Sequence, residues 1–516
     1  MTNKKQILLA IPIYILLFHI FGFSGHFGFD DIEYARLANG LNHGYFEWNN
    51  HYFHRFTIIS LTSIFYYCLD INQWSSALPT MLVAVFILWL LFKFIKKEKS
   101  FYVLFIIALT ACSNWWIFYT DKLMPDMYVC LSVLIAVYLL HRKNFKTSYN
   151  SYSNGIGLGI ITIIGFLSKG SFILFTPVVL YLLIKDLLAK QHKHFWLSFI
   201  VSSSIMSLAY FAMMYIQTGD ALIRFAAIDK SSYANPCQFM AEGFKNVIHR
   251  LSLGYIDLLV SSGIIVPFIF VFASINYSSV KSIFKTKYSY HFFRLLSILA
   301  LISSNFMTIS WHTYNPMCLD PRHYLFLIPI GSLGALHFFK SKNANKNAKL
   351  IGFLLIAGLW SFRINNTLFF KIYLPLFIAS YMYAYKANWK FLSKISLIVA
   401  LFIQPIAWIR YANKVDYEAQ RKFTSVSISN LENITLYSHS AEKNIYNYDQ
   451  KFKDQNIDWK NLDSIEKRDK NLNNYILENA HSRKLSHEKI VSLKDLKLEL
   501  ICADKSLSIF LYKVLD

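Results

Sequence analysis

The sequence predicts an all-α polytopic membrane protein with a small extramembrane α/β domain at its C-terminus. Its 516 residues are 55% hydrophobic and only 16% charged, with a mean hydropathy of +0.35, whereas a soluble chain of this length needs more polar surface. Apolar runs recur as far as Ile409, and roughly 20 apolar residues suffice for one crossing of a bilayer. After Arg410 these runs stop, and Lys, Asn, Asp and Glu become more frequent.

The distribution of Lys and Arg favours a membrane partner over a nucleic acid. The formal net charge of +22 would suggest nucleic-acid binding in a soluble protein. Here the basic residues cluster in short loops between apolar runs, which is typical of cytoplasmic loops. We therefore expect the membrane as a partner, and no nucleic acid.

About 13 apolar runs are expected to cross the membrane, and the Lys/Arg rule orients them without conflict. The rule places the N-terminus in the cytoplasm and the C-terminal domain outside, in a multi-pass protein of a bacterial inner or plasma membrane. The first run lacks a small-residue cleavage pattern, so we expect a retained span rather than a signal peptide. The expected spans are residues 6–23, 77–91, 101–119, 127–140, 156–167, 171–184, 196–216, 255–275, 293–310, 324–339, 350–362, 368–385 and 395–409.

Two domains follow from this pattern: a membrane domain over residues 1–410 and a soluble domain over residues 411–516. Within the first, the outer loop 24–76 carries an apolar stretch at 57–69 whose length suits an interfacial or re-entrant helix better than a span. In the second, strands are expected at 435–437 and 507–514, and 461–478 has a helical pattern. The six cysteines form no C-x-x-C pair, so no zinc ribbon is indicated, although Cys237 and Cys318 both fall in outer loops and leave a bridge between them open.

The first outer loop opens with three carboxylates within four residues, Asp30, Asp31 and Glu33. Grouped acids repel one another, so such a cluster holds a cation or tunes a general base. On a helix, Asp30 and Glu33 would share one face and Asp31 would turn away. The alternative is a solvated helix start with Asp as its N-cap.

Asp126 and Lys169 lie at other outer boundaries between loop and span. Asp126 follows Pro125 directly before a span, where an Asp also caps a helix and meets its positive end. Lys169 separates two apolar halves, where a lysine is costly unless it reaches water, an acid or a phosphate; the alternative is a lysine that snorkels to the interface.

Arg322 stands at the next outer boundary, and Arg55 follows His54 in the first outer loop. An arginine there suits a bidentate phosphate contact or, alternatively, a headgroup anchor. His54, His249 and His312 all fall in outer loops, and three histidines near an acid cluster permit a divalent metal site without demonstrating one.

Together these residues place acids and phosphate-binding cations on one face, at the depth of the lipid headgroups. That combination suits transfer of a group from a lipid-linked phosphate. A carboxylate would deprotonate an acceptor hydroxyl. The cations, with or without a metal, would stabilise the phosphate as it leaves.

Over residues 1–410 the layout and several short motifs resemble the GT-C glycosyltransferases, specifically the branch of the protein O-mannosyltransferases and the lipid A aminoarabinose transferase. Members of that branch have about 13 spans and, in the aminoarabinose transferase, an outer C-terminal domain. The motifs that carry the resemblance are Asp30-Asp31-Ile32-Glu33-Tyr34, Tyr52-Phe53-His54-Arg55, Pro125-Asp126, Lys169-Gly170 and Arg322-His323-Tyr324.

The resemblance implies an undecaprenyl- or dolichyl-phosphate sugar donor and inversion at the anomeric carbon. The acceptor would be a hydroxyl or phosphate on a lipid, a glycan or a protein. Asp30 or Asp31 becomes the expected catalytic carboxylate, with Asp126 as its partner and Glu33 as a further catalytic candidate.

For the donor phosphate the resemblance implies Arg55, Lys169 and Arg322. The sequence departs from the family at His54, where the family has a Glu. In the aminoarabinose transferase that Glu helps to bind a metal with a histidine from a later loop, matched here only loosely by His249. A second departure is His323, which separates the Arg and Tyr of the late motif.

Three other functions stay open at this point. A flippase or transporter of lipid-linked sugars predicts ionisable residues deep within spans and a repeat between halves. The apolar runs contain Asp257, Arg363 and Lys371 but no repeated pair of broken spans. A polysaccharide polymerase would rely on outer arginines rather than an acid cluster, and a receptor module would not need so many spans.

Overall fold

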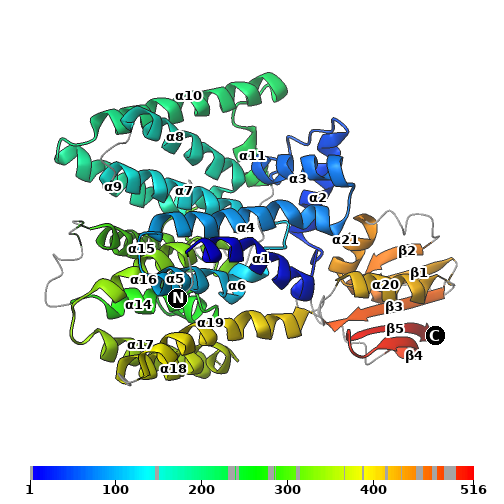
Figure 1. The fold of residues 1–516 in the computed structure, drawn as a ribbon. Coiled ribbons are helices and arrows are strands. Elements are labelled where there is room, and N and C mark those ends of the chain that lie inside the picture. Colours follow the sequence, from blue (N-terminus) through cyan, green and yellow to red (C-terminus); the bar gives the residue numbers. More distant parts are fainter. Residues whose placement is uncertain are drawn as a thin grey trace.

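The computed structural model describes residues 4–145, 150–230, 239, 243–276, 284, 286, 288–309, 314–364, 367–385, 389–412, 417–429, 431, 433–448, 457–467, 473–480 and 496–515. Helices make up the chain as far as α20, and a five-stranded sheet follows (Figure 1).

The helices coincide with the predicted apolar runs, but many are shorter than a complete span. The helices of the first half are α1 (Lys4–Gly22), α2 (Asp30–Asn42), α3 (Phe56–Leu69), α4 (Gln73–Ile95), α5 (Ser100–Ala111), α6 (Asn114–Phe118), α7 (Asp126–Phe145), α8 (Ser151–Ser168), η1 (Gly170–Phe175), α9 (Thr176–Leu188), α10 (Lys193–Thr218) and α11 (Ile223–Lys230). The second half contains α12 (Phe244–His249), η2 (Arg250–Gly254), α13 (Tyr255–Ser261), α14 (Ile265–Ala273), α15 (Ser289–Phe306), η4 (Pro321–Tyr324), α16 (Leu327–Lys340), α17 (Lys346–Arg363), η5 (Phe369–Tyr373), α18 (Leu374–Tyr385), α19 (Lys390–Ala412) and α20 (Tyr417–Ile428).

By length and composition, six of the described helices can cross a membrane, or seven if one bent pair counts as a single span. This is fewer than the 13 or so spans expected from hydropathy. One reason is that apolar runs are interrupted: the run at 101–119 breaks after Cys112 into α5 and α6, and the run at 255–275 bends by 104°. The second break contains Gly263 at φ +74°, a left-handed conformation that suits glycine.

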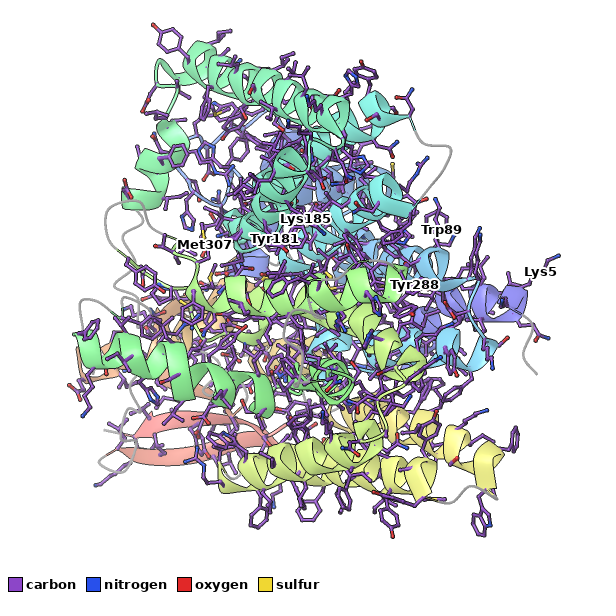
Figure 2. All side chains as sticks on the ribbon, turned by 90° about the vertical axis from the view of Figure 1, so that its left-hand side faces the viewer. Lys5, Trp89, Tyr181, Lys185, Tyr288 and Met307 are labelled. Carbon is purple, nitrogen blue, oxygen red and sulfur yellow. The ribbon has the colours of Figure 1, made fainter. Side chains whose placement is uncertain are left out.

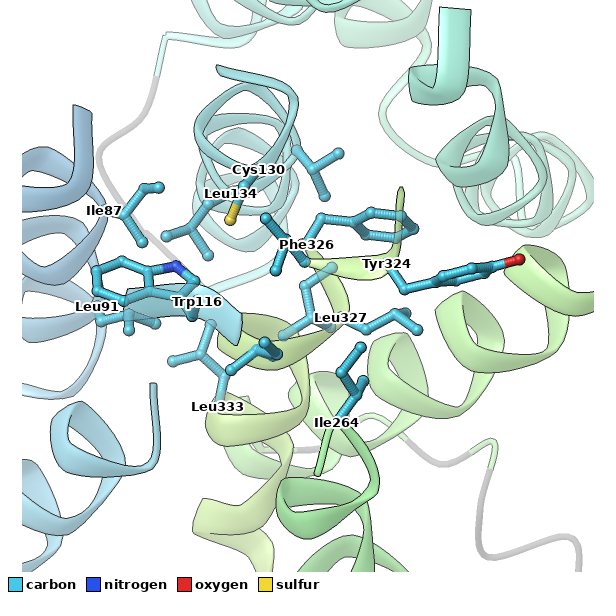
Figure 3. Packing of buried hydrophobic residues seen from close by; sticks show 14 of the residues in the cluster. Ile87, Leu91, Trp116, Cys130, Leu134, Ile264, Tyr324, Phe326, Leu327 and Leu333 are labelled. Atoms are coloured by element: carbon cyan, nitrogen blue, oxygen red, sulfur yellow. The ribbon is translucent and has the colours of Figure 1, made fainter. Parts of the chain in front are cut away.

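The helices pack around one hydrophobic cluster that extends from α1 to α19. Figure 3 shows part of it, with Trp116 of α6 close to Ile87 and Leu91 of α4, and Leu327 and Leu333 of α16 nearby. Trp116 and Leu327 are both fully buried. The core therefore joins the early helices to the late ones.

Basic residues in the described part of the chain lie together at one end of the bundle, as the Lys/Arg pattern predicts. At one end, Lys340 pairs with Glu98 at 2.5 Å, and Lys143 pairs with Asp186. Lys185 belongs to the same end, where its Nζ donates to the hydroxyl of Thr286 at 3.1 Å; Figure 2 labels it among the side chains of the helices. The acidic loops meet at the opposite end.

The predicted helix at 57–69 is present as α3. It follows α2, and the two pack side by side (Figure 1). One side of α3 leaves Leu61, Ile64 and Tyr67 exposed, a pattern that suits contact with lipid.

The C-terminal part contains a mixed sheet of strand order β2-β1-β3-β5-β4. Its strands are β1 (Ile434–Ser438), β2 (Ile457–Asn461), β3 (Asn473–Asn479), β4 (Lys497–Asp504) and β5 (Ile509–Leu515), with α21 (Ser440–Tyr448) after β1 and the short helix η8 (Leu462–Lys467) after β2. β1 runs parallel to β2 and β3, whereas β5 is antiparallel to β3 and β4.

This sheet confirms the predicted α/β class and both predicted strands. Consecutive residues of β1 are buried on opposite faces of the sheet: Leu436 lies in one apolar cluster and Tyr437 in another. The predicted helix at 461–478 is wrong, because among the residues described there η8 is a short 3₁₀ helix and β3 begins at Asn473. Buried Ile476 and Leu477 explain the error, since a strand buried on both faces has no period of two.

Candidate active site

Loops from distant parts of the sequence meet at the end of the bundle that lies next to the C-terminal sheet. They are the entry to α2, the entry to α7, the break between α8 and η1, and the turn η4. Each of these loops carries a residue singled out from the sequence.

Asp30 is the first residue of α2, and both of its carboxylate oxygens are bound. Oδ2 accepts a hydrogen bond from Nη1 of Arg322 at 2.9 Å, and Oδ1 accepts one from the hydroxyl of Tyr52 at 2.8 Å. Burial raises the pKa of Asp30, but the charges of Arg322 and Arg55 and the Tyr52 bond together lower it below its ordinary value. Asp30 is therefore ionised at neutral pH.

Asp31 turns away from Asp30, as its position on a helix predicts. Oδ2 accepts from the backbone N–H of Phe27 at 2.7 Å and lies 3.0 Å from Nδ1 of His26, and Oδ1 accepts from the N–H of Phe29 at 2.8 Å. These contacts close the loop that precedes α2. The environment of Asp31 is that of a structural carboxylate.

Glu33 belongs to a more exposed network. It accepts hydrogen bonds from Arg36 at 2.7 and 2.9 Å and from Nδ2 of Asn50 at 2.6 Å, and Arg36 also binds Glu47. Its charge is thus neutralised locally by Arg36.

Asp126 and Lys169 form a buried ion pair, with Nζ 2.7 Å from Oδ1. Nζ also lies 3.0 Å from Nδ1 of His323, whose pKa is lowered to about 4 by burial and by the charge of Lys169. The neutral ring therefore accepts a hydrogen bond from the ammonium through Nδ1. Within the described part of the chain, Oδ2 of Asp126 is buried and accepts no hydrogen bond.

Arg322 and Arg55 are both near enough to Asp30 to lower its pKa. Besides Asp30, Arg322 has Asp320 beside it, with Nε 2.9 Å from Oδ2. The guanidinium of Arg55 stacks over the rings of Tyr52 and Tyr34, at 4.9 and 5.4 Å from their centroids. Arg55 is near enough to Lys169 to lower its pKa, so the cations predicted from the sequence share one site.

A buried arginine that the sequence did not single out supports the turn η4. Arg250 donates to the carbonyl of Met317, to Oδ1 of Asn305 and to the hydroxyl of Tyr324, each at 2.7 Å. In Figure 3 the ring of Tyr324 points its hydroxyl away from the cluster around Leu327. Arg250 thereby ties the segment before Arg322 to the helix core.

The residues proposed for a metal do not converge. His54 uses Nε2 to bind the carbonyl of Trp48 at 2.7 Å, and its Nδ1 lies 3.4 Å from the hydroxyl of Tyr210. His249 is exposed on α12. The described residues contain no group of three or more His, Cys, Asp or Glu side chains placed to hold a metal, and His312 lies outside them. His54 instead packs between helices, so the predicted His54–His249 site does not fit.

The structure thus brings together Asp30, Asp126, Arg55, Lys169 and Arg322, and leaves Asp31 and Glu33 in separate networks. Sequence reasoning assigned no part in the site to His323, although it adjoins Arg322. Tyr52 was noted only within its motif. A tyrosine or histidine becomes recognisable as a partner only when the loops are brought together.

Comparison with known proteins gives a result at the level of fold. No family model and no curated protein matches the sequence. Among solved structures, ArnT from Cupriavidus metallidurans bound to undecaprenyl phosphate matches with a TM-score of 0.55 at 11% identity, over 98% of this chain and 97% of that one. The apo state of the same ArnT matches over the same shares, with a TM-score of 0.50.

At 11% identity this likeness concerns architecture alone. It extends over both the membrane helices and the C-terminal sheet, because almost the whole of each chain is covered. The chain is therefore a multi-span membrane protein with the fold of ArnT.

Proposed function

We propose that the chain is an inverting membrane glycosyltransferase that moves a sugar from a polyprenyl phosphate to an acceptor on the outer face. The observation that carries the proposal is the contact of the Asp30 carboxylate with Arg322 beside the Asp126–Lys169 pair. A base and cations suited to phosphate thus share one site at the end of the bundle.

In this reaction Asp30 acts as the general base. It takes the proton of the acceptor hydroxyl while the acceptor oxygen forms a bond to the anomeric carbon. The bond between that carbon and the phosphate oxygen breaks, and the phosphate leaves with the electron pair. A single displacement of this kind inverts the anomeric carbon; an acceptor phosphate would attack in the same way without needing a base.

The leaving phosphate changes from one negative charge to two, so it needs positive charge placed in advance. Arg322 offers a planar set of N–H donors that matches phosphate. Lys169 offers the N–H that its two contacts, to Asp126 and His323, do not use. Arg55 adds a third positive charge close by.

Asp126 holds Lys169 in position, because its Oδ1 is the acid partner of the ammonium. Its second oxygen, buried and without a donor among the described residues, would take a hydrogen bond from the sugar. We assign Asp31 and Glu33 to support of the loop rather than to chemistry, on the basis of their contacts described above.

Two further observations support this proposal. The solved ArnT structure of the same fold is bound to undecaprenyl phosphate, which favours a polyprenyl-phosphate donor. Cys318 is disulfide-bonded, and disulfides persist in oxidising compartments. Since Cys318 and the acidic loops lie at the same end, this favours an outer site; Cys237 lies outside the described residues.

The flippase alternative is less favoured. It needs ionisable groups along a path through the spans. Asp257 instead binds Nε1 of Trp360 at 2.6 Å and lies 3.3 Å from Arg363, and the Arg363 side chain is 60% exposed. This pair joins two helices near their ends rather than lining a path.

The test uses the purified chain in proteoliposomes with a panel of polyprenyl-phosphate sugars, each labelled in the sugar, and a cell-envelope extract as acceptor. We expect label to move to an acceptor and polyprenyl phosphate to be released, and we expect that lipid to co-purify with the protein by mass spectrometry. Movement of intact donor between leaflets without transfer would contradict the proposal and favour a flippase.

A further inference from the structure

The C-terminal sheet domain contacts the loop that positions Asp30. Helix α21 begins two residues after β1 ends and lies against the segment before α2 (Figure 1). Nδ2 of Asn444 donates to the carbonyl of Gly28 at 3.2 Å. Ile445 and Ile32 are buried together, with Phe27 packed against them.

The contact is close enough to require glycine. Gly28 has φ +91°, and a Cβ there would lie 2.9 Å from the carbonyl oxygen and 3.0 Å from the Cβ of Ala441. Ala441 is fully buried. Two backbones therefore meet at this point without an intervening side chain, so a change on either side must move the other.

The loop is held from two directions. From the membrane domain, Asp31 binds the N–H groups of Phe27 and Phe29. From the C-terminal domain, α21 holds the carbonyl of Gly28, which lies between them, and covers Ile32 on the first turn of α2. Asp30 lies between these two supports, and its carboxylate must aim at Arg322 and at the acceptor.

We propose that α21 positions Asp30, so that the C-terminal domain is a working part of the active site rather than an appended module. Ala441, Asn444 and Ile445 are positioning residues that act through Gly28 and Ile32. This inference rests on the proposed function. A displacement of about 1 Å between reacting groups costs up to a hundred-fold in rate. A loosened contact should therefore lower kcat even where the protein remains folded.

The proposal predicts separate effects on turnover and on donor binding, because the cations proposed to bind the donor phosphate lie on elements other than α21. Lys169 and Arg322 belong to the α8–η1 break and to η4, and no described contact joins either to α21. A change in α21 should therefore lower kcat without weakening the binding of undecaprenyl phosphate. General destabilisation would reduce the amount of active protein, so kcat is expressed per molecule that binds undecaprenyl phosphate, as the binding stoichiometry gives it.

The experiment measures kcat and the Kd for undecaprenyl phosphate in the full chain, with Ile445→Ala, Ala441→Leu and Gly28→Ala. The matched control is Ile465→Ala, the same loss of buried side chain in the second apolar cluster of the domain, away from the loop. We expect kcat to fall about ten- to a hundred-fold in the three variants, with a Kd no more than two-fold above that of wild type, and kcat to stay near wild type in the folded control.

The double variant Ile32→Ala/Ile445→Ala should lose no more kcat than the worse of its single variants, because both act on one contact. Wild-type kcat in Ile445→Ala and Ala441→Leu, or an equal fall in Ile465→Ala, overturns the inference. Absence of transfer in the wild-type chain instead overturns the proposed function, so the two failures are distinguishable.

Discussion

Arg322 and Asp30 are 292 residues apart in the sequence, yet Nη1 of the arginine lies 2.9 Å from Oδ2 of the aspartate. The pair joins the proposed base to a proposed ligand of the donor phosphate. A bound phosphate must therefore compete with Asp30 for Arg322. When it does so, Asp30 loses the charge that lowers its pKa most, and becomes a stronger base only after the donor has bound.

The first prediction concerns Asp30→Asn and the binding of undecaprenyl phosphate. Removing the carboxylate frees Arg322, so the variant should bind the lipid about three- to ten-fold more tightly, roughly 0.6–1.4 kcal/mol. Kd can be measured by native mass spectrometry in detergent. Glu47→Gln removes an acid that pairs with Arg36 instead and should leave Kd unchanged; unchanged or weaker binding in Asp30→Asn would rule out the competition.

The second prediction concerns pH. Burial lowers the pKa of Lys169 to about 8, although the charge of Asp126 opposes the shift. The ammonium is the form that binds phosphate, so kcat/KM for the donor should be full below pH 8 and fall about ten-fold per unit above it. The donor is a phosphodiester and does not itself titrate in this range.

The same profile in Lys169→Arg provides the control, because a guanidinium stays charged throughout. The alkaline fall should disappear in that variant if it retains activity. A profile that is flat from pH 7 to 9.5 in the wild type, or identical in both proteins, would contradict the assignment of Lys169.

The third prediction is that Arg322→Ala and Lys169→Ala each raise the donor KM or lower kcat. A charge-assisted hydrogen bond contributes about 1.5–3 kcal/mol, so kcat/KM should fall roughly ten- to 150-fold. Lys340→Ala, which removes a cation at the other end of the bundle, should have little effect. Normal kinetics in both site variants would remove the phosphate-binding assignment.

The fourth prediction concerns stability. Arg250→Met leaves the buried Oδ1 of Asn305 without its donor, at about 1–3 kcal/mol, and removes one hydrogen bond each from the Met317 carbonyl and the Tyr324 hydroxyl, which remain bonded to each other. The thermal unfolding midpoint in detergent should fall by several degrees. The comparison is Arg363→Ala, whose exposed pair with Asp257 should contribute about 0–1 kcal/mol; an equal loss in both variants would contradict the role given to Arg250.

Much of the architecture could be predicted from the sequence because hydropathy and charge report the environment of each segment directly. The alternation of basic and acidic loops was enough to place Asp30, Asp126, Lys169 and Arg322 at the same end. Helix breaks were not predictable in this way. They depend on local backbone conformation, such as that of Gly263 at positive φ. A break of this kind does not change the hydropathy of the segment, so hydropathy does not reveal it.

The hydrogen-bond partners of the site residues could not be predicted from the sequence either. His54 has the chemistry of a metal ligand, but whether its nitrogens are available depends on Trp48 and Tyr210, which lie nearby only in the fold. In the sequence His323 only separates the Arg and Tyr of a motif, and its contact with Lys169 depends on a turn that brings together residues 154 positions apart.

The most direct test of the account is single-turnover transfer by wild type and Asp30→Asn from the polyprenyl-phosphate sugar that the wild type accepts. We expect the wild type to transfer the sugar with inversion. The variant should lose about 10²- to 10⁴-fold in rate, the usual contribution of a general base, while it still binds undecaprenyl phosphate. A rate in Asp30→Asn equal to that of the wild type would contradict the assignment of Asp30 as the base, and with it the mechanism.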